Sequence, residues 1–354
     1  MTPSIQDLAD RVAGLSGAEQ RIFEHIFSLD SVRGSLKLPS AMLPWAAAQF
    51  GAVERVTSQK IIRITNRITL ESSVYNPLRA LRPHNFDSKA AASAEDTSCI
   101  DRFATPLEST PEDVFGRVKG KYCITAANVA KCEQYHCVIV FKKPDPMDFG
   151  CNEVADYIET GWNWVQRAHD FDPLAQNPLF LWNCTNRGGA SIRHGHAQVV
   201  LGRGSHYAKV EHLRRAALDY EDQYGANYFE DLFHIHQALG LGWKSGDAGV
   251  MVYLTALKQN EIMMLGPDLT ASFVKSLARM VVDFRDKLRV KSFNLGIVFP
   301  PLGDGAGWER FPVIARLLDR GDTSSISSDI SAMELYGANV VTSDPWETAQ
   351  ALRQ

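Results

Sequence analysis

The sequence predicts an α+β fold made of two similar halves, each with mostly antiparallel strands flanked by helices, and a helical extension at the N-terminus. Strand-like and helix-like segments alternate, and the order strand, helix, strand occurs twice. No repeat is visible in the letters, so the order of the elements alone predicts the duplication. The first half has strands at His136–Phe141 and Leu179–Trp182 around a helix at Glu153–His169, and the second has strands at Gly249–Leu257 and Phe293–Phe299 around a helical stripe from Phe273 to Leu288.

The same pattern divides the chain into three regions. Residues 1–58 are predicted as the helical N-terminal extension, because their apolar residues recur at helical spacing. Residues 59–205 form the half with a histidine-rich strand, and residues 206–354 form the second half and a C-terminal helix that opens near Ser343. Further elements are predicted as strands at Ile61–Leu70 and Gly120–Ile124 and as one long helical stretch at Leu213–Leu239.

The composition is that of an ordinary globular protein. The 354 residues carry a net charge of −4, with 45% hydrophobic and 22% charged residues. These values give no reason to expect nucleic acid or a membrane as a partner. Acidic side chains within residues 1–27 argue against a signal peptide, and no apolar run reaches the ~18 residues of a membrane span. The six cysteines lack the spacing of a disulfide framework, so we expect a cytoplasmic protein.

The most informative segment is a strand with two histidines and a glutamine. Residues 197–201 are rich in good strand formers, and side chains two positions apart share one face of a strand. His194, His196 and Gln198 therefore point into one site. They follow the small residues Gly188–Ser191, which let backbone N–H groups approach an anion.

An imidazole beside a phosphate-binding turn can transfer a nucleotidyl group through a covalent histidine intermediate. With an ordinary pKa near 6.5, about three quarters of such a histidine is neutral at pH 7, so its attack needs no separate base. A backbone carbonyl at the other ring nitrogen can fix the tautomer. The alternative is a pair of strand histidines that only pack or meet solvent, but the preceding Gly-Ala-Ser and the following glutamine favour the chemical role.

Several motifs in the same order resemble one known family. Gly189-Ala-Ser-Ile-Arg-His-Gly-His-Ala-Gln198 is similar to the pattern G-A-S-x-x-H-x-H-x-Q of the histidine-triad (HIT-like) superfamily, in the branch of galactose-1-phosphate uridylyltransferases, ADP-glucose phosphorylases and diadenosine tetraphosphate phosphorylases. The resemblance covers roughly residues 60–205. Other segments that resemble this branch are Arg79–Phe86, Ser109–Phe115, Ala127-Asn128, His136–Val140 and Asn186–Gly188.

The resemblance implies roles for the three side chains of the strand. His196 would be the nucleophile, His194 would shape the site, and Gln198 would hydrogen-bond the phosphoryl oxygens of the intermediate. Hydrolases of the superfamily carry a histidine where Gln198 stands, so the resemblance implies a transferase or a phosphorylase. Glutamine is also neither an acid nor a base near pH 7, which makes the activation of water harder.

The resemblance also implies substrate-binding residues, each with a structural alternative. Ser191 and the amides around Gly189 would bind phosphates, although Ser191 could simply cap the turn. Asn186 and Asn128 would contact phosphate, ribose or base, but asparagine is also common in turns. Arg79 and Arg82 would neutralise a diphosphate, or form a solvated basic face.

Many members of that branch hold a structural zinc, and this chain departs from the ligand pattern. Of the ligands, Cys99 and His194 remain, while Arg102 stands where a second cysteine would be. Asp145 is a poor substitute for the missing histidine. These residues do not close a tetrahedral site, so a structural zinc is doubtful and no cofactor is expected to be required.

The sequence thus predicts a nucleotidyltransferase that works by double displacement through a His196–nucleotidyl intermediate. Its substrates would be a nucleotide sugar or a dinucleotide together with a phosphate acceptor, and a homodimer is possible for a relative of this kind. Two alternatives stay open: a nucleotide hydrolase, and a nucleotide-binding sensor without turnover. A second H-x-H at His234 and His236 falls in a predicted helix, where its side chains diverge, so no site is expected there.

Overall fold

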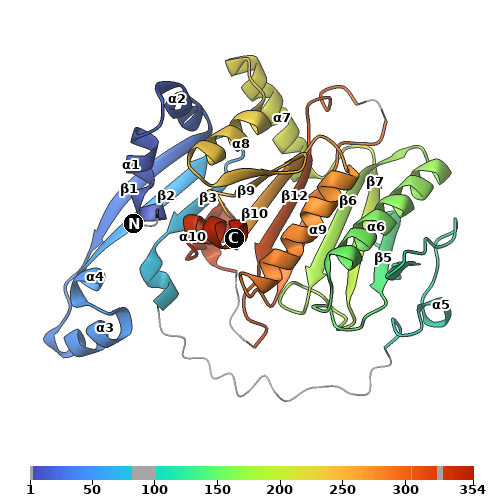
Figure 1. The fold of residues 1–354 in the computed structure, drawn as a ribbon, viewed down its shortest axis with the longest axis horizontal. Helices are drawn as coiled ribbons and strands as arrows, with labels where there is room; N and C mark the ends of the chain where they lie inside the picture. Colours follow the sequence, from blue (N-terminus) through green and yellow to red (C-terminus); the bar gives the residue numbers. More distant parts are fainter. Residues whose placement is uncertain (1–2, 82–100, 304, 325–329) are drawn as a thin grey trace.

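A nine-stranded antiparallel sheet forms the centre of the molecule, in the strand order β4-β5-β7-β6-β11-β12-β10-β9-β8 (Figure 1). The structure is a computed structural model that describes residues 3–81, 101–303, 305–324 and 330–354. The strands of this sheet are β4 (Cys123–Ala127), β5 (Tyr135–Phe141), β6 (Ala175–Cys184), β7 (His196–Arg203), β8 (Gly242–Ser245), β9 (Ala248–Val252), β10 (Gln259–Gly266), β11 (Phe293–Val298) and β12 (Val313–Asp319).

The sheet contains the predicted duplication. In the first half the chain runs β4, β5, helix α6 (Cys151–Phe171), β6 and β7, and the strands lie in the order β4-β5-β7-β6. In the second half it runs β9, β10, helix α9 (Ala271–Asp286), β11 and β12, and the strands lie in the order β9-β10-β12-β11. The halves meet where β6 pairs with β11. The predicted α+β class with two similar halves is therefore confirmed.

Helices α6 and α9 lie side by side on one face of the sheet (Figure 1). Both are amphipathic, and each begins at a defined cap: Glu153 accepts the backbone N–H of Gly150 before α6, and Thr270 accepts the N–H of Phe273 in α9. Gly161 lets α6 approach the sheet closely, because a Cβ there would lie 3.0 Å from Val199 of β7. The functional side chains must therefore use the other face.

A second, four-stranded sheet has the order β1-β2-β3-β13 and joins the two ends of the chain. Strand β1 (Phe27–Ser35) pairs with β2 (Ser58–Asn66) over nine residues, so the expectation that residues 1–58 are helical is wrong for this segment. Strand β3 (Ser72–Tyr75) pairs in parallel with β13 (Ala338–Val341), far away in sequence. A strand whose partner is remote gives little local signal.

Other boundaries differ for local reasons. The strand expected at Ile61–Leu70 ends at Asn66, whose side chain accepts the N–H groups of Ile68 and Thr69 and so turns the chain. The long helical stretch is two helices, because Gly225 adopts a left-handed conformation and Asn227 caps the next helix. Strands β10 and β12 were not predicted.

The remaining elements complete the layers around the two sheets. The helices are α1 (Leu8–Ala13), α2 (Gly17–Ile26), α3 (Leu43–Phe50), α4 (Val53–Thr57), α5 (Pro106–Ser109), α7 (Ala208–Tyr224), α8 (Tyr228–Ala238) and α10 (Pro345–Arg353), and short 3-10 turns lie at Ile5–Asp7, Ser40–Met42, Pro77–Leu81 and Ala332–Tyr336. Among the helices of the described residues, none has the length and apolar character needed to cross a bilayer.

Gly188 lies where the two halves pack together, so a substitution at this position tests that packing. A Cβ at this position would lie 2.4 Å from the Cys184 carbonyl oxygen and 2.8 Å from that of Phe293, and backbone atoms at the end of β6 and the start of β11 cannot move aside easily. We expect Gly188→Ala to lower the free energy of unfolding by about 1–3 kcal/mol, measured by urea denaturation. Gly14→Ala is the control, since its Cβ meets only ordinary contacts at 3.5 Å. Equal stability of both variants would contradict this account of the junction.

Candidate active site

The histidine-rich strand β7 lies between β5 and β6, with Gln198 paired to Val138 on one side and to Leu181 on the other. Val199 faces α6, so the neighbouring Gln198 points to the opposite face of the sheet. His196 lies two residues earlier in the strand and shares that face. The face expected from strand alternation is therefore the one observed.

His196 is held in one tautomer. Its Nδ1 lies 2.8 Å from the carbonyl oxygen of His194, which can only accept a hydrogen bond. Nδ1 therefore carries the proton, and the lone pair is left on Nε2. The side chain is buried, and burial lowers the pKa of His196, helped by repulsion from His194. A neutral ring with a free Nε2 is the form that can act as a nucleophile.

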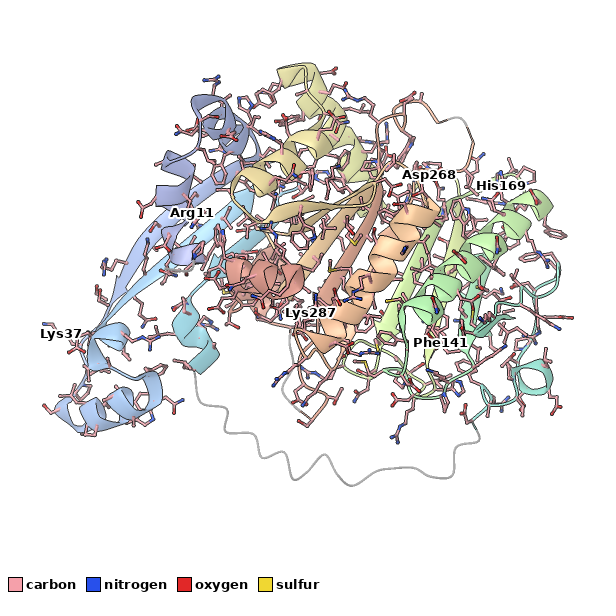
Figure 2. The ribbon with its side chains drawn as sticks, in the orientation of Figure 1. Arg11, Lys37, Phe141, His169, Asp268 and Lys287 are labelled. Atoms are coloured by element: carbon pink, nitrogen blue, oxygen red, sulfur yellow. The ribbon has the colours of Figure 1, made fainter. Side chains whose placement is uncertain are left out.

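His194 faces two acceptors. Its Nδ1 lies 2.8 Å from Oδ2 of Asp101, and its Nε2 lies 2.9 Å from the carbonyl oxygen of Phe141, so both contacts are hydrogen bonds when both nitrogens carry a proton. Phe141, the last residue of β5, is labelled in Figure 2. Burial opposes ionisation of Asp101, but hydrogen bonds from His194 and from the backbone lower the pKa of this carboxyl. The ring edges also meet Phe103, whose centroid lies 5.8 Å from that of His194 and 5.4 Å from that of His196.

Gln198 is oriented by a third histidine. Nε2 of His136 lies 2.7 Å from Oε1 of Gln198, and Nδ1 of His136 accepts the backbone N–H of Cys132 at 3.2 Å. Nε2 of His136 must then be the donor, and the carboxamide oxygen of Gln198 is occupied. The Gln198 NH₂ group therefore points away from His136 and is the group that can meet a phosphoryl oxygen. Asn128 lies beside this cluster, with Nδ2 3.1 Å from His136 Nε2, but both atoms carry hydrogens in this tautomer and do not bond each other; Oδ1 of Asn128 accepts the N–H of Ala130 at 2.9 Å.

The turn before the histidines is tightly folded. Gly189 has φ of 97°, a conformation that glycine adopts without strain, and its N–H donates to the carbonyl oxygen of Asn186 at 3.0 Å. This amide was expected to face a phosphate, and it is instead used within the turn. The side chain of Asn186 likewise accepts the N–H of Arg187 at 2.9 Å, which is the turn role given above as its alternative. Ser191 is exposed beside this turn.

Of the two predicted arginines, Arg79 lies within the residues that the structure describes. Arg79 is exposed on the Pro77–Leu81 turn and lines a cavity together with Arg187 and Arg320. Arg320 and Gly188 are linked through Asn294, whose Nδ2 donates to the Gly188 carbonyl oxygen at 2.6 Å and whose Oδ1 accepts from Arg320 at 2.5 Å. Arg79 therefore lines a cavity whose other arginines adjoin the glycine turn. Arg82 lies outside the described residues.

The described residues do not fit the zinc site that the resemblance implies. Both ring nitrogens of His194 contact protein oxygen atoms, and Asp145 uses its carboxylate to accept the N–H of Met147 at 2.9 Å. The parts of the chain that the structure describes hold no group of three His, Cys, Asp or Glu side chains placed for a metal. Cys99 lies outside the described residues. No step of the chemistry below is derived through a metal.

Sequence reasoning missed Asp101, Phe103 and His136 as parts of the site. His136 was noticed only as the start of a strand motif, and no local pattern marks the other two. The second H-x-H lies in α8, as expected: His236 is fully buried, and His234 is exposed near Glu19. It forms no site with His196.

The comparisons with known proteins agree with this geometry at the level of the fold. No family model matches the chain, and no curated protein matches it. Solved structures do: an ADP-glucose phosphorylase from Arabidopsis thaliana, solved with bound ADP-glucose, has a TM-score of 0.63 at 14% identity and covers 83% of this chain and 99% of its own. A galactose-1-phosphate uridylyltransferase-like protein from the same plant has a TM-score of 0.57 at 15% identity, covering 73% and 92%.

A third solved structure, a uridylyltransferase, has a TM-score of 0.56 at 13% identity and covers 82% of this chain and 96% of its own. These likenesses show the fold: the chain has the HIT-like α+β fold seen in the solved uridylyltransferase and ADP-glucose phosphorylase. The resemblance read from the motifs is therefore confirmed for the fold.

The state of the His196 ring can be measured directly. Because burial disfavours the charged imidazolium, we expect His196 to titrate below the ordinary value of 6.5 and to stay neutral as the pH falls through that value. Nitrogen-15 NMR of histidine-labelled protein should show a proton on Nδ1 and an unprotonated Nε2 at pH 7, with His196→Gln identifying the signal. A proton on Nε2, or a pKa at or above 6.5, would contradict the arrangement.

Proposed function

We propose that the protein is a nucleotidyltransferase that works by double displacement through a covalent nucleotidyl–His196 intermediate. The observation that carries the proposal is the contact of Nδ1 with the His194 carbonyl oxygen, which leaves the lone pair on Nε2 of a neutral ring. A residue that only packs has no need for this combination of fixed tautomer and lowered pKa.

In the first step, Nε2 of His196 attacks the α-phosphorus of the donor. The N–P bond forms as the bond between the α-phosphorus and the bridging oxygen breaks, and the electron pair leaves with the departing phosphate or sugar phosphate. Nδ1 keeps its proton, which stays hydrogen-bonded to the His194 carbonyl oxygen. The positive charge that develops on the ring is therefore stabilised by an acceptor already in place. No proton has to be removed from the nucleophile.

In the second step, an oxygen of a phosphate acceptor attacks the same phosphorus, the N–P bond breaks, and the electron pair returns to Nε2. The NH₂ group of Gln198, turned outward by His136, donates to a phosphoryl oxygen in both steps. Gln198 cannot take a proton from water near pH 7, which favours acceptors that arrive as anions. Hydrolysis therefore fits the site less well than transfer.

The pair of His194 and Asp101 adds a fixed charge arrangement beside the reacting atoms. Nδ1 of His194 lies 2.8 Å from the Asp101 carboxylate, and its Nε2 lies 2.9 Å from the Phe141 carbonyl oxygen. Such a pair is held in place by its own hydrogen bonds and does not reorganise as charge shifts onto the phosphoryl oxygens. Without the carboxylate, the Phe141 carbonyl oxygen would still hold the His194 ring at Nε2.

For the substrates we propose a nucleotide sugar or a dinucleotide as the donor and a phosphate or sugar phosphate as the acceptor. The solved ADP-glucose phosphorylase, which shares the fold, contains ADP-glucose, and this supports a nucleotide sugar as the first donor to test. A hydrolase would release nucleoside monophosphate at a rate that does not depend on the acceptor. A sensor would bind the donor without forming a covalent adduct.

Covalent labelling tests the proposed function. Incubation with ADP-glucose and, in parallel, a uridine diphosphate sugar should raise the intact mass of the protein by one nucleotidyl group, because the first displacement does not need the acceptor. His196→Ala should abolish the label, and His234→Ala, which changes a histidine of the second H-x-H, should leave it intact. Donor binding without any label would overturn the proposal, as would a label that persists in His196→Ala.

The role of His136 gives a separate prediction. His136→Phe removes the donor that holds Gln198 Oε1, and loss of one hydrogen bond to a polar group costs about 1 kcal/mol. We expect labelling to slow by several-fold in His136→Phe and in Gln198→Ala, and the double variant to be no slower than the slower single variant, because both act through one carboxamide. Additive losses, measured by rapid-quench labelling rates, would show that His136 does not act through Gln198.

A further inference from the structure

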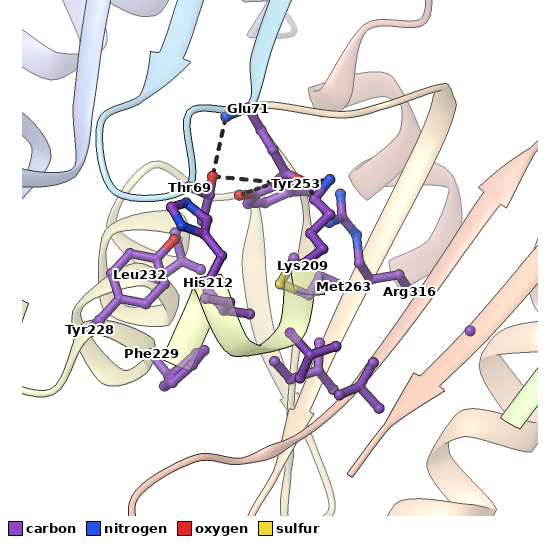
Figure 3. Close-up of a pocket in the computed structure, with 15 residues that line it drawn as sticks. Thr69, Glu71, Lys209, His212, Tyr228, Phe229, Leu232, Tyr253, Met263 and Arg316 are labelled. Carbon is purple, nitrogen blue, oxygen red and sulfur yellow. Dashed lines mark hydrogen bonds and ion pairs between the residues drawn. The ribbon is translucent and has the colours of Figure 1, made fainter. Parts of the chain in front are cut away.

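A cavity lies in the second half of the fold (Figure 3), and the strand register from Gln198 to Arg316 places it on the sheet face that carries His196. It has a volume of about 180 Å³. Its walls come from β10, β11 and β12, from α7 and α8, and from the turn between β2 and β3, so the N-terminal sheet helps to close it. For comparison, an engineered cavity of about 150 Å³ with apolar walls admits benzene. The cavity therefore has room for a planar ring.

The walls of this cavity are mostly apolar and aromatic. Tyr228 and Phe229 of α8 and Tyr253 next to β9 contribute rings, and Met263 of β10 contributes a thioether that adapts to ring faces. Such walls suit the base of a nucleotide better than a sugar, which needs several hydrogen-bonding groups. Other apolar residues that line it are Val210, Leu213, Leu232, Val298 and Ile314.

A buried network holds two of these rings in place. Nδ2 of Asn66 lies 2.7 Å from the hydroxyl oxygen of Tyr228 and 3.1 Å from that of Tyr253. The Tyr253 hydroxyl in turn donates to the Glu71 carboxylate at 3.0 Å. The Arg316 guanidinium donates both to Glu71 at 2.7 Å and to Glu261 at 2.5 Å, and so links the two carboxylates. Burial opposes ionisation of Glu71, but its cationic neighbours lower its pKa to about 2. The rings are therefore fixed before any ligand arrives, which reduces the entropy cost of binding.

The ammonium group of Lys209 lies at the exposed side of the cavity. Lys209 at the start of α7 contacts Glu71 at 2.9 Å while its side chain stays 65% exposed, and His212 lies one turn further along the same helix. The carboxylates of Glu71 and Glu261 are each engaged by a cation or a hydroxyl. An anionic group attached to a ring in the cavity would meet Lys209 first.

A row of four partly exposed residues, here called the track, crosses the sheet face between this cavity and the candidate active site. Gln198, Leu181, Gly296 and Arg316 are successive cross-strand neighbours on β7, β6, β11 and β12. Adjacent strands lie about 4.8 Å apart, so three steps place Gln198 about 14 Å from Arg316. All four residues are partly exposed, and a Cβ at Gly296 would meet nothing within 4 Å. Among the residues that the structure describes, none covers the sheet face at Gly296 of β11, which lies between the cavity and Gln198.

We propose that this cavity is a second nucleotide-binding subsite, with the base between the aromatic walls and the phosphates directed along the track toward Gln198. The inference rests on the proposed function for the first nucleotide at His196. Two sources share this chemistry: the distal half of a dinucleoside polyphosphate, and a separate mononucleotide. The track favours the linked dinucleotide, because Gly296 leaves room for a phosphate chain between the two places.

The test follows the Met263 methyl group by carbon-13 NMR in the full-length His196→Ala protein, which cannot turn over. Diadenosine tetraphosphate and AMP serve as probes, and Met263→Leu identifies the signal. We expect diadenosine tetraphosphate to shift the Met263 methyl and Lys209→Gln to weaken its binding. Gly296→Leu should raise its Kd at least tenfold because the new side chain blocks the track, and Gly17→Leu on α2, where a Cβ has room, is the matched control.

The outcomes separate the sources and the two proposals. If AMP alone shifts Met263 and Gly296→Leu has no effect, the subsite takes a separate nucleotide. If neither probe shifts Met263 at concentrations that saturate binding, the subsite is refuted, whatever the labelling of His196 shows. Covalent labelling by ADP-glucose is measured separately, on the protein with His196 intact. If no label forms there, the proposed function is refuted, but a shift of the Met263 methyl would still support the subsite.

Discussion

The hydrogen bond between the His196 ring and the backbone of His194 is the constraint on which the proposed chemistry depends. It determines which ring nitrogen keeps a lone pair, and it acts between two residues of one strand end, so any bend there would break it. The surroundings protect that geometry. Gly195 packs so closely that a Cβ would lie 2.7 Å from the Phe141 ring, and Asp101 and the Phe141 carbonyl hold the His194 ring on both sides. His196 is thus positioned by the sheet itself rather than by a mobile loop.

The two halves of the sheet share a topology but differ in the chemistry of one face. In the first half, β7 presents imidazoles and a carboxamide, and its partner β5 supplies the histidine that orients the carboxamide. In the second half, β12 presents Arg316 to two buried carboxylates, and the face is closed by aromatic residues and by the N-terminal sheet. The same backbone plan therefore carries the candidate active site in one half and the proposed subsite in the other, on a single continuous sheet.

How much of this could be read from the sequence depends on the distance between interacting residues. The shared face of His196 and Gln198 follows from strand alternation, and α6 and α9 follow from their apolar stripes, so these were predictable. Asp101 and His136 act on the site from 93 and 62 residues away in sequence, and nothing local marks a carboxylate or an imidazole as a partner. Strand β1 was not predicted for the same reason, because the signal for this strand is its pairing with the distant strand β2. The turn roles of Gly189 and Asn186 needed backbone angles that letters do not contain.

The stereochemical course at phosphorus tests the central claim most directly. A donor with one configuration at an α-phosphorothioate would be converted with inorganic phosphate or a sugar phosphate as the acceptor, and the configuration of the product determined by phosphorus-31 NMR. Each in-line displacement inverts the phosphorus, so two displacements through His196 predict net retention of configuration. Net inversion would mean that the acceptor attacks the donor directly, and the His196 intermediate would have to be abandoned.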